Sequence, residues 1–170
     1  IIYQAVYELV PHKTGGLTIS KTVTGTAGEK DKQFTFTVTI GAEGTYNYTG
    51  SKSGTITSGG TVQLKHGEFI TISGIPEGTS YTVVESDNSG YEVTKTGDTG
   101  TIVKAEEVTE DTEAVEAAAA EFTNTRKTGE LEVTKTVSSD LAADANADFS
   151  FTVTLDDTSI NGIYGGMTFE

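Results

Sequence analysis

The chain has 170 residues, 35% of them hydrophobic, and a formal net charge of −14. This length suffices for one good core, or for one and part of a second. With no cysteine and two histidines, His12 and His66, the composition excludes thiol catalysis, disulfide bonds and the common zinc-finger spacings. The negative charge, which no cluster of basic and aromatic residues offsets locally, argues against nucleic-acid binding.

The first residues, "IIYQAVYELVPHK", have neither a basic n-region nor a signal-peptide cleavage pattern. We interpret residues 1–14 as the end of a preceding domain or a linker, in a chain that starts like an internal fragment. No stretch approaches the roughly 18 consecutive apolar residues needed to span a bilayer, so no membrane insertion is expected within this fragment.

Short alternating runs rich in Thr, Val, Ile, Phe and Tyr follow one another, separated by Gly-rich or Asp/Asn-rich turns such as "TAGEKDK" and "DNSG". This pattern predicts an all-β sandwich. The predicted strands are "YQAVYEL", "GLTISKTV", "QFTFTVTI", "GTITS", "GTVQLKHG", "EFITISGI", "SYTVVES", "YEVTKTG", "TGTIVK", "AEFTNTR", "GELEVTKTV", "DFSFTVTL" and "GMTFE".

One segment departs from this pattern, because Ala105 to Phe122 is rich in Ala and Glu and lacks Gly and Pro. We expect a short acidic helix or loop insertion near 105–121, which connects the sheets.

An internal repeat organises the chain. "GGLTISKTVTG…KQFTFTVTI" returns as "GELEVTKTVSS…ADFSFTVTL", with an offset of 114 residues at the leucines (131 − 17) and 115 at the phenylalanines (149 − 34). A unit of this length is a domain repeat. The sequence predicts a complete domain at 15–127 and the opening strands of a second, truncated repeat at 128–170.

Lysine occupies an unexpected face of the first strand in both copies. Alternate residues of a strand share a face, so Lys21 lies with Leu17 and Val23, and Lys135 lies with Leu131 and Val137. A buried ammonium without a partner costs several kcal/mol or loses its proton. The sequence should therefore supply a partner for each lysine.

Two other strands carry the complementary polar residues. In "SYTVVES" the apolar face of Tyr81 and Val83 continues to Glu85, and in "EFTNTR" the face of Phe122 continues to Asn124. Lysine, glutamate and asparagine are thus all expected on apolar faces of one domain.

These three elements resemble a known family. "ISKTV", the run "GIPEGTSYTVVE" and the closing "FTNTR" before a fresh "TGELEVTKTV" are similar to the collagen-adhesin B-type (CnaB-like) repeats, and most of all to the pilin isopeptide-linkage domains of Gram-positive surface fibres. The resemblance covers residues 15–127 fully and 128–170 in part. It implies tandem Ig-like β-sandwiches.

The resemblance also implies roles for three side chains. Lys21 would attack the side-chain amide of Asn124, Glu85 would handle the proton, ammonia would leave, and an isopeptide bond would remain. The competing interpretation is that Lys21 extends its ammonium to the sheet edge and forms an ordinary salt bridge with Glu85, with Asn124 as a turn residue. Lys135 has no matching Glu or Asn downstream, so we expect it to be the nucleophile of the next repeat, unlinked here.

Weaker motifs have simpler interpretations. Lys13 in "VPHKTGG" is a candidate for an intersubunit lysine joined by sortase, although a solvated linker lysine is preferred. "DANAD" at 144–148 has the spacing of a calcium loop but lacks its glycine and bidentate glutamate, so no metal site is expected. The Asn47 sequon is interpreted as part of a strand or turn, and His66 as an exposed turn residue.

The resulting hypothesis is a structural repeat of a pilin shaft or adhesin stalk, extracellular and anchored to the cell wall. Its partners would be neighbouring pilin subunits or tandem repeats and sortase, and it would need no cofactor. An adhesin module that binds a host protein or glycan is the alternative. A conventional enzyme is disfavoured, because paired-carboxylate and phosphate-loop motifs are missing.

Overall fold

The computed structural model describes residues 13–103, 117–155, 162–164 and 167–169. The strand predicted at 3–9 and most of the predicted acidic insertion lie outside these ranges. The chain divides into two compact units, Ile1–Arg126 and Lys127–Glu170, and each is described by itself. Within the described residues no helix is long and apolar enough to cross a membrane.

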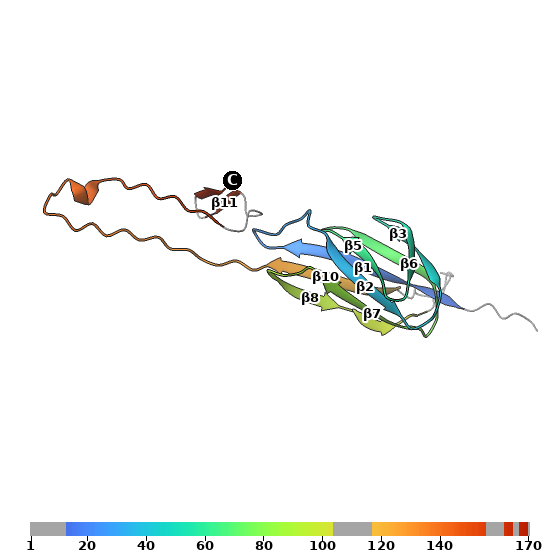
Figure 1. Ribbon diagram of the computed structural model, residues 1–170. Coiled ribbons are helices and arrows are strands. Elements are labelled where there is room, and N and C mark those ends of the chain that lie inside the picture. The colour runs from blue at the N-terminus through green and yellow to red at the C-terminus, as the bar shows by residue number, and fades with distance from the viewer. Residues whose placement is uncertain (1–12, 104–116, 156–161, 165–166, 170) are drawn as a thin grey trace, which may run out of the picture. The chain divides into compact units, whose positions relative to one another are not determined.

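The first unit is a sandwich of two sheets (Figure 1). The larger sheet has the strand order β4-β3-β6-β1-β10-β8, and the smaller has β5-β2-β7-β9. The strand bounds are β1 Thr14–Thr24, β2 Phe34–Ile40, β3 Thr45–Gly50, β4 Gly54–Thr57, β5 Gly60–Leu64, β6 Phe69–Pro76, β7 Ser80–Ser86, β8 Tyr91–Thr96, β9 Thr99–Thr101 and β10 Ala118–Arg126. The predicted all-β Ig-like sandwich is confirmed.

Each long strand buries alternate side chains, as its sequence pattern predicts. In β1, Leu17, Ile19 and Val23 are fully buried, while the threonines between them are less so. The core between the sheets is formed by Leu17, Ile19, Val23, Phe34, Phe36, Val38, Ile40, Tyr46, Ile56, Val62, Leu64, Ile70, Ile72, Ile75, Tyr81, Val83, Tyr91, Ile102, Ala120 and Phe122.

The first and last strands of the sandwich are neighbours. β1 pairs with β10 in parallel, from Leu17 opposite Ala118 to Thr24 opposite Thr125, whereas the other strand pairs of the described residues are antiparallel. Because the two strands run the same way, the chain enters β1 at one end of the sheet and leaves β10 at the other (Figure 1).

In the first unit, two segments differ from their prediction. The segment Thr45–Gly50, with Asn47 at its middle, forms β3, which the sequence pattern did not single out as a separate strand. Residues 118–121 belong to β10, so the C-terminal part of the predicted helix or loop is strand instead. These alanines pair with β1 on one side, and this tertiary contact overrides their local helix preference.

The pairing of β1 with β6 ends at Ser20, and beyond it side chains bond the backbone of β1 in place of a neighbouring strand. The Val23 N–H donates to His66 Nδ1 at 3.0 Å, and Lys30 Nζ donates to the Val23 carbonyl at 3.3 Å. His66 lies in a turn, as interpreted, but it is only partly exposed and its ring accepts a backbone hydrogen bond. Its ring satisfies a backbone donor that would otherwise lack a partner.

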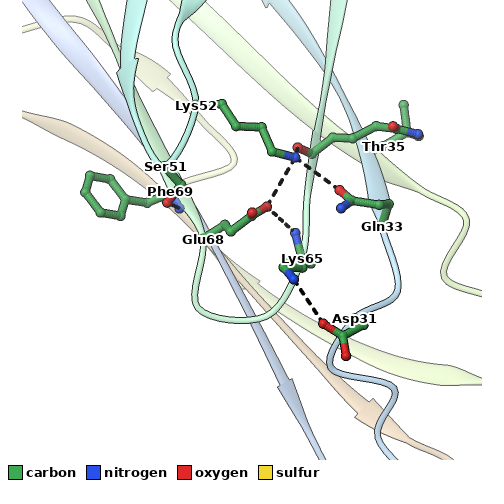
Figure 2. A network of polar contacts seen from close by, with 9 residues as sticks. Asp31, Gln33, Thr35, Ser51, Lys52, Lys65, Glu68 and Phe69 are labelled. Carbon is green, nitrogen blue, oxygen red and sulfur yellow. Dashed lines mark hydrogen bonds and ion pairs between the residues drawn. The ribbon is translucent and has the colours of Figure 1, made fainter.

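A polar network joins the loops that precede β2, β4 and β6 (Figure 2). Lys52 lies 3.2 Å from Glu68, which also accepts the Lys65 backbone N–H at 2.9 Å, and the Lys65 ammonium contacts Asp31 at 2.9 Å. The Asp31 side chain is 95% exposed, so this part of the network is open to solvent.

The second unit contains little regular structure among its described residues. Residues 127–155 hold one 3-10 turn, Asp144–Asn146, and no strand, and a hairpin follows with β11 at Gly162–Tyr164 and β12 at Met167–Phe169. The strands predicted at 129–137 and 148–155 are therefore absent. Their apolar side chains Leu131, Val133, Phe149 and Phe151 are exposed, since no second sheet covers them within the described part of this unit.

Candidate functional site

Lys21 lies on the inner face of β1, as strand alternation predicts. Its side chain is 0% exposed, although lysine is almost never fully buried without a partner. The lysine therefore does not extend to the sheet edge. The strand holds it there because Ile19 and Val23 on the same face are core residues and β10 pairs with β1 from Leu17 to Thr24.

Glu85 supplies the partner from the opposite sheet. Its Oε1 lies 2.7 Å from Lys21 Nζ, and its side chain is 1% exposed. The other carboxylate oxygen, Oε2, accepts a hydrogen bond of 3.3 Å from Asn88 Nδ2. Because Glu85 follows Tyr81 and Val83 on the buried face of β7, this ion pair spans the two sheets inside the sandwich.

Asn124 occupies the inner face of β10 and is 0% exposed. It stands opposite Val23 in the parallel pairing, and Phe122 stands opposite Lys21, so Asn124 is one pleat along the same face from the lysine. Among the described residues, neither Asn124 Oδ1 nor Nδ2 has a hydrogen-bond partner. A buried amide without partners costs about 1–3 kcal/mol per group and calls for a functional explanation.

An aromatic ring completes the surroundings of the lysine. Lys21 Nζ lies 4.3 Å from the centroid of the Phe34 ring, within the range of a cation–π contact. Phe36 and Phe122 meet edge to face, with centroids 5.1 Å apart, on neighbouring inner positions of β2 and β10. Because Phe122 stands opposite Lys21 and Phe36 opposite Glu85 in the strand pairings, these rings flank the buried ion pair.

This enclosure changes the acidity of the lysine. Burial lowers the pKa of Lys21 below its ordinary value of 10.5, and the hydrogen bond and charge of Glu85 oppose this shift without cancelling it. A lysine with a lowered pKa gives up its proton more readily, and its neutral amine is a nucleophile. Glu85, at 2.7 Å, is placed to accept that proton.

The structure brings Lys21 and Glu85 into contact and places Asn124 on the same inner surface. The competing interpretation of an ordinary salt bridge is right about the ion pair but wrong about its place, because the pair is buried. Asn124 is a strand residue and not a turn residue. Phe34 and Asn88 were not anticipated, because no strand pattern indicates which core ring or loop amide will face a given charge.

The remaining candidates lie apart from these three residues along the chain. Lys13 is exposed and directly precedes β1, and its backbone carbonyl accepts the Glu77 N–H at 2.9 Å. Lys135 is exposed in the second unit, where its Nζ contacts the Thr136 carbonyl at 3.0 Å. Their chemical roles stay predictions.

Comparison with known proteins gives the family. The family described as a domain of unknown function (DUF7601) matches residues 15–126. The chain belongs to this family. Its boundaries coincide closely with β1 through β10, so the matched region is the complete sandwich of the first unit.

Relatives come from bacterial surface fibres. The chain is 42% identical over 101 residues to the pilus tip adhesin Cpa of Streptococcus pyogenes, which covers 55% of this chain and 14% of that protein. A solved structure of the pilus-presented adhesin Spy0125 (Cpa) matches with a TM-score of 0.51 and 28% identity, over 71% of this chain and 29% of that one. The major pilin T3.2 of Streptococcus pyogenes serotype GAS13637 matches at 26% identity over 68% of this chain and 46% of that one, with a TM-score of 0.49. The chain thus spans less than a third of the adhesin it matches.

Proposed function

We propose that residues 15–126 are a structural module of a surface pilus or adhesin stalk, of the collagen-adhesin B type, that cross-links itself through an isopeptide bond between Lys21 and Asn124. The observation that carries this proposal is the buried Lys21–Glu85 ion pair, on the same inner surface as an asparagine whose amide atoms have no hydrogen-bond partner among the described residues. The similarity to a pilus adhesin supports the setting.

The proposed reaction uses the three side chains once. Glu85 takes a proton from the Lys21 ammonium, and the neutral amine attacks Cγ of Asn124. The protonated carboxyl of Glu85 polarises the Asn124 carbonyl and then returns its proton as the Cγ–Nδ2 bond breaks. An amide joins Lys21 Nζ to Asn124 Cγ, and the departing nitrogen leaves with the remaining protons as ammonium. No turnover follows, so the module is not an enzyme toward other molecules.

A cross-link between β1 and β10 would suit a fibre under tension. The two strands are parallel neighbours, so pulling on the ends of the unit shears one strand against the other. A bond from Lys21 to Asn124 would enclose 103 residue steps (124 − 21) and, by the loop-entropy argument used for disulfides, add about 4.7 kcal/mol of stability. Unlike a disulfide, an amide is not reduced by thiols.

The wider setting follows from the same proposal. The module would be extracellular, on a fibre anchored to the cell wall, with neighbouring pilin subunits or tandem repeats as its partners and sortase as the joining enzyme. Lys135 would be the nucleophile of the following repeat, and Lys13 remains a candidate for an intersubunit lysine. The alternative function is that of a ligand-binding adhesin module, and its support is the similarity to a protein named as a pilus tip adhesin.

Intact mass spectrometry followed by peptide mapping tests the cross-link. We expect a mass short by one ammonia, with the peptides of Lys21 and Asn124 joined. Glu85→Gln should restore the full mass, whereas Glu68→Gln, which alters a glutamate paired with Lys52 at the surface, should leave the cross-link in place. A full mass for the unmodified sequence would reject the covalent mechanism and favour an adhesin sandwich held by a buried ion pair.

A further inference from the structure

A second polar cluster lies at the end of the sandwich where β10 finishes. The Tyr91 hydroxyl donates to Glu29 Oε2 at 2.8 Å and accepts the Glu29 backbone N–H at 3.2 Å. Arg126 Nη1 contacts the same oxygen, Glu29 Oε2, at 3.1 Å. We call Glu29, Tyr91 and Arg126 the latch.

The latch ties a loop to the end of the larger sheet. Glu29 belongs to the loop 25–33 between β1 and β2, whereas Tyr91 begins β8 and Arg126 ends β10, directly opposite each other in the pairing. Gly25, with φ of 92°, turns the chain out of β1, and a Cβ there would approach the Arg126 backbone nitrogen to 3.2 Å. The loop can therefore lie close against the end of β10.

Ring contacts connect the latch with the lysine. Tyr91 and Phe34 meet edge to face, with centroids 5.4 Å apart at 82°, and Phe34 contacts Lys21 Nζ at 4.3 Å. Burial and the hydrogen bond to Glu29 raise the pKa of Tyr91 above its ordinary value of 10.0, so its hydroxyl remains a donor further into the alkaline range than a free tyrosine. The contacts run without a break from Arg126 through Glu29, Tyr91 and Phe34 to Lys21.

The second copy of the motif shows that the ring contact alone does not bury a lysine. Phe149 occupies the position equivalent to Phe34, and Lys135 Nζ lies 4.5 Å from its centroid. Both Lys135 and Phe149 are nevertheless exposed. In the first unit Phe34 is 0% exposed, and it is covered at its edge by Tyr91, which the latch holds.

We propose that Glu29, Tyr91 and Arg126 are positioning residues for the Lys21–Asn124 cross-link: the closed latch holds Tyr91 on Phe34 and so keeps water from Lys21 while it reacts. This inference rests on the proposed function. The latch reaches Lys21 through described contacts that run from Tyr91 to Phe34 and from Phe34 to the ammonium.

Several charged groups lie near the rings of Phe34 and Tyr91, where an open latch would admit water. Lys32 Nζ lies 5.4 Å from the Phe34 centroid and 5.1 Å from that of Tyr91, and Arg126 Cζ lies 5.3 Å from Tyr91. Among the described residues, the other charges at these rings are Lys21, which contacts Phe34 and pairs with Glu85, and Glu29, which contacts the Tyr91 hydroxyl. Water admitted at this end would weaken the desolvation that lowers the pKa of Lys21.

The test follows cross-linking during refolding. Chains from a brief cell-free pulse are collected in denaturant before they fold, diluted into buffers of graded pH, and sampled for loss of ammonia by intact mass. The ion pair of Lys21 and Glu85 holds one titratable proton, and so does the neutral pair of amine and carboxylic acid that reacts. Acid adds a second proton and alkali removes the only one. The cross-linking rate of the unmodified sequence should therefore be flat in the middle of the pH range and fall at both ends.

Glu29→Gln and Tyr91→Phe open the latch in two ways, and the second keeps the ring that covers Phe34. We expect each to slow cross-linking about tenfold or more, by analogy with small displacements of reacting groups, and to move the alkaline fall of the profile to higher pH. Asp31→Asn is the matched control, because Asp31 lies in the same loop and pairs with Lys65 at the surface. It should leave rate and profile unchanged.

The outcomes separate the two proposals. Full mass for the unmodified chain at every pH rejects the cross-link itself, and the latch with it. Loss of ammonia at unchanged rate and pH profile in folded Glu29→Gln and Tyr91→Phe rejects the latch and leaves the cross-link standing. A slower rate with an unshifted profile would mean that the latch is merely structural, which also contradicts the proposal. Circular dichroism shows whether each variant is folded. If Glu29→Gln does not fold, the result for Tyr91→Phe alone tests the latch.

Discussion

The same heptapeptide pattern occurs in both units with opposite results. In "LTISKTV" of the first unit, Leu17 is 0% exposed and the Lys21 side chain is enclosed, whereas in "LEVTKTV" of the second unit Leu131 is 60% exposed and Lys135 is open to solvent. The contact of the lysine with a downstream phenylalanine is present in both, at 4.3 and 4.5 Å.

This comparison shows which part of the site is local. The lysine–phenylalanine contact forms within the first 20 or so residues of either copy and needs no sandwich around it. The burial, the lowered pKa of Lys21 and the ion pair with Glu85 come from β7 and β10, which lie some 60 to 100 residues later in the chain. A motif alone thus places the lysine, and distant strands make it reactive.

The largest effect on stability is expected when the buried lysine of the first unit is replaced. The same replacement of its counterpart in the second unit is the comparison. Lys21→Met removes the proposed cross-link and leaves Glu85 buried without its cation, which together should lower the free energy of unfolding by roughly 5 kcal/mol or more. Lys135→Met changes an exposed residue and should alter it by less than about 0.5 kcal/mol. Thermal unfolding followed by circular dichroism should show a Tm lowered by on the order of 20 °C for Lys21→Met and an almost unchanged Tm for Lys135→Met. Equal effects of the two would contradict the comparison.

A smaller contrast is expected for the leucines that open each motif. Leu17→Ala deletes a fully buried side chain and should destabilise the first unit by about 2–5 kcal/mol. Leu131→Ala should change little, since its side chain is already exposed. Urea unfolding of both variants measures this directly, and a marked loss of stability in Leu131→Ala would show that the second copy is packed in solution.

The pH dependence of stability sharpens the comparison further. In Asn124→Ala, which cannot form the cross-link, the Lys21 pKa stays lowered in the folded state but is ordinary, near 10.5, in the unfolded state. The unfolded chain then binds more protons between these two values, so stability should rise with pH through that window. Adding Lys21→Met to the same background gives the baseline for the other groups. A difference between the two that is flat up to pH 10.5 would contradict the lowered pKa.

The smallest effect is expected at the Lys65–Asp31 pair, the part of the network in Figure 2 that is open to solvent. Asp31→Asn removes an ion pair with Lys65, and exposed pairs contribute about 0–1 kcal/mol that salt screens. Unfolding at low and high ionic strength should show a loss that fades with added salt. A loss that persists in high salt would place this network in the same class as the buried pair.

The sequence predicted well which site residues face the interior, but it did not predict which residues lie opposite them in neighbouring strands. Strand alternation placed Lys21, Glu85 and Asn124 inside, because a period of two needs only local information. The parallel pairing that sets Asn124 opposite Val23 depends on register between strands that are distant in the sequence. Alternation gives no information about register across sheets.

The wrong predictions have the same cause. Residues 129–137 and 148–155 alternate as strands should, yet the described structure has no strand there, because alternation produces an apolar face without supplying a surface to cover it. Residues 118–121 have helix-forming side chains but pair with β1. In the first place the local pattern lacks the distant segment that would complete it, and in the second a distant strand overrides the local preference.

The parallel neighbours β1 and β10 also set the length that each module would contribute to a fibre. Had the last strand run against the first, the chain would return to its point of entry and successive modules would fold back on one another. With parallel strands the polypeptide advances by at least the length of β1, whose 11 residues span roughly 36 Å at about 3.3 Å per residue. A filament of such modules would grow in reach with every copy added.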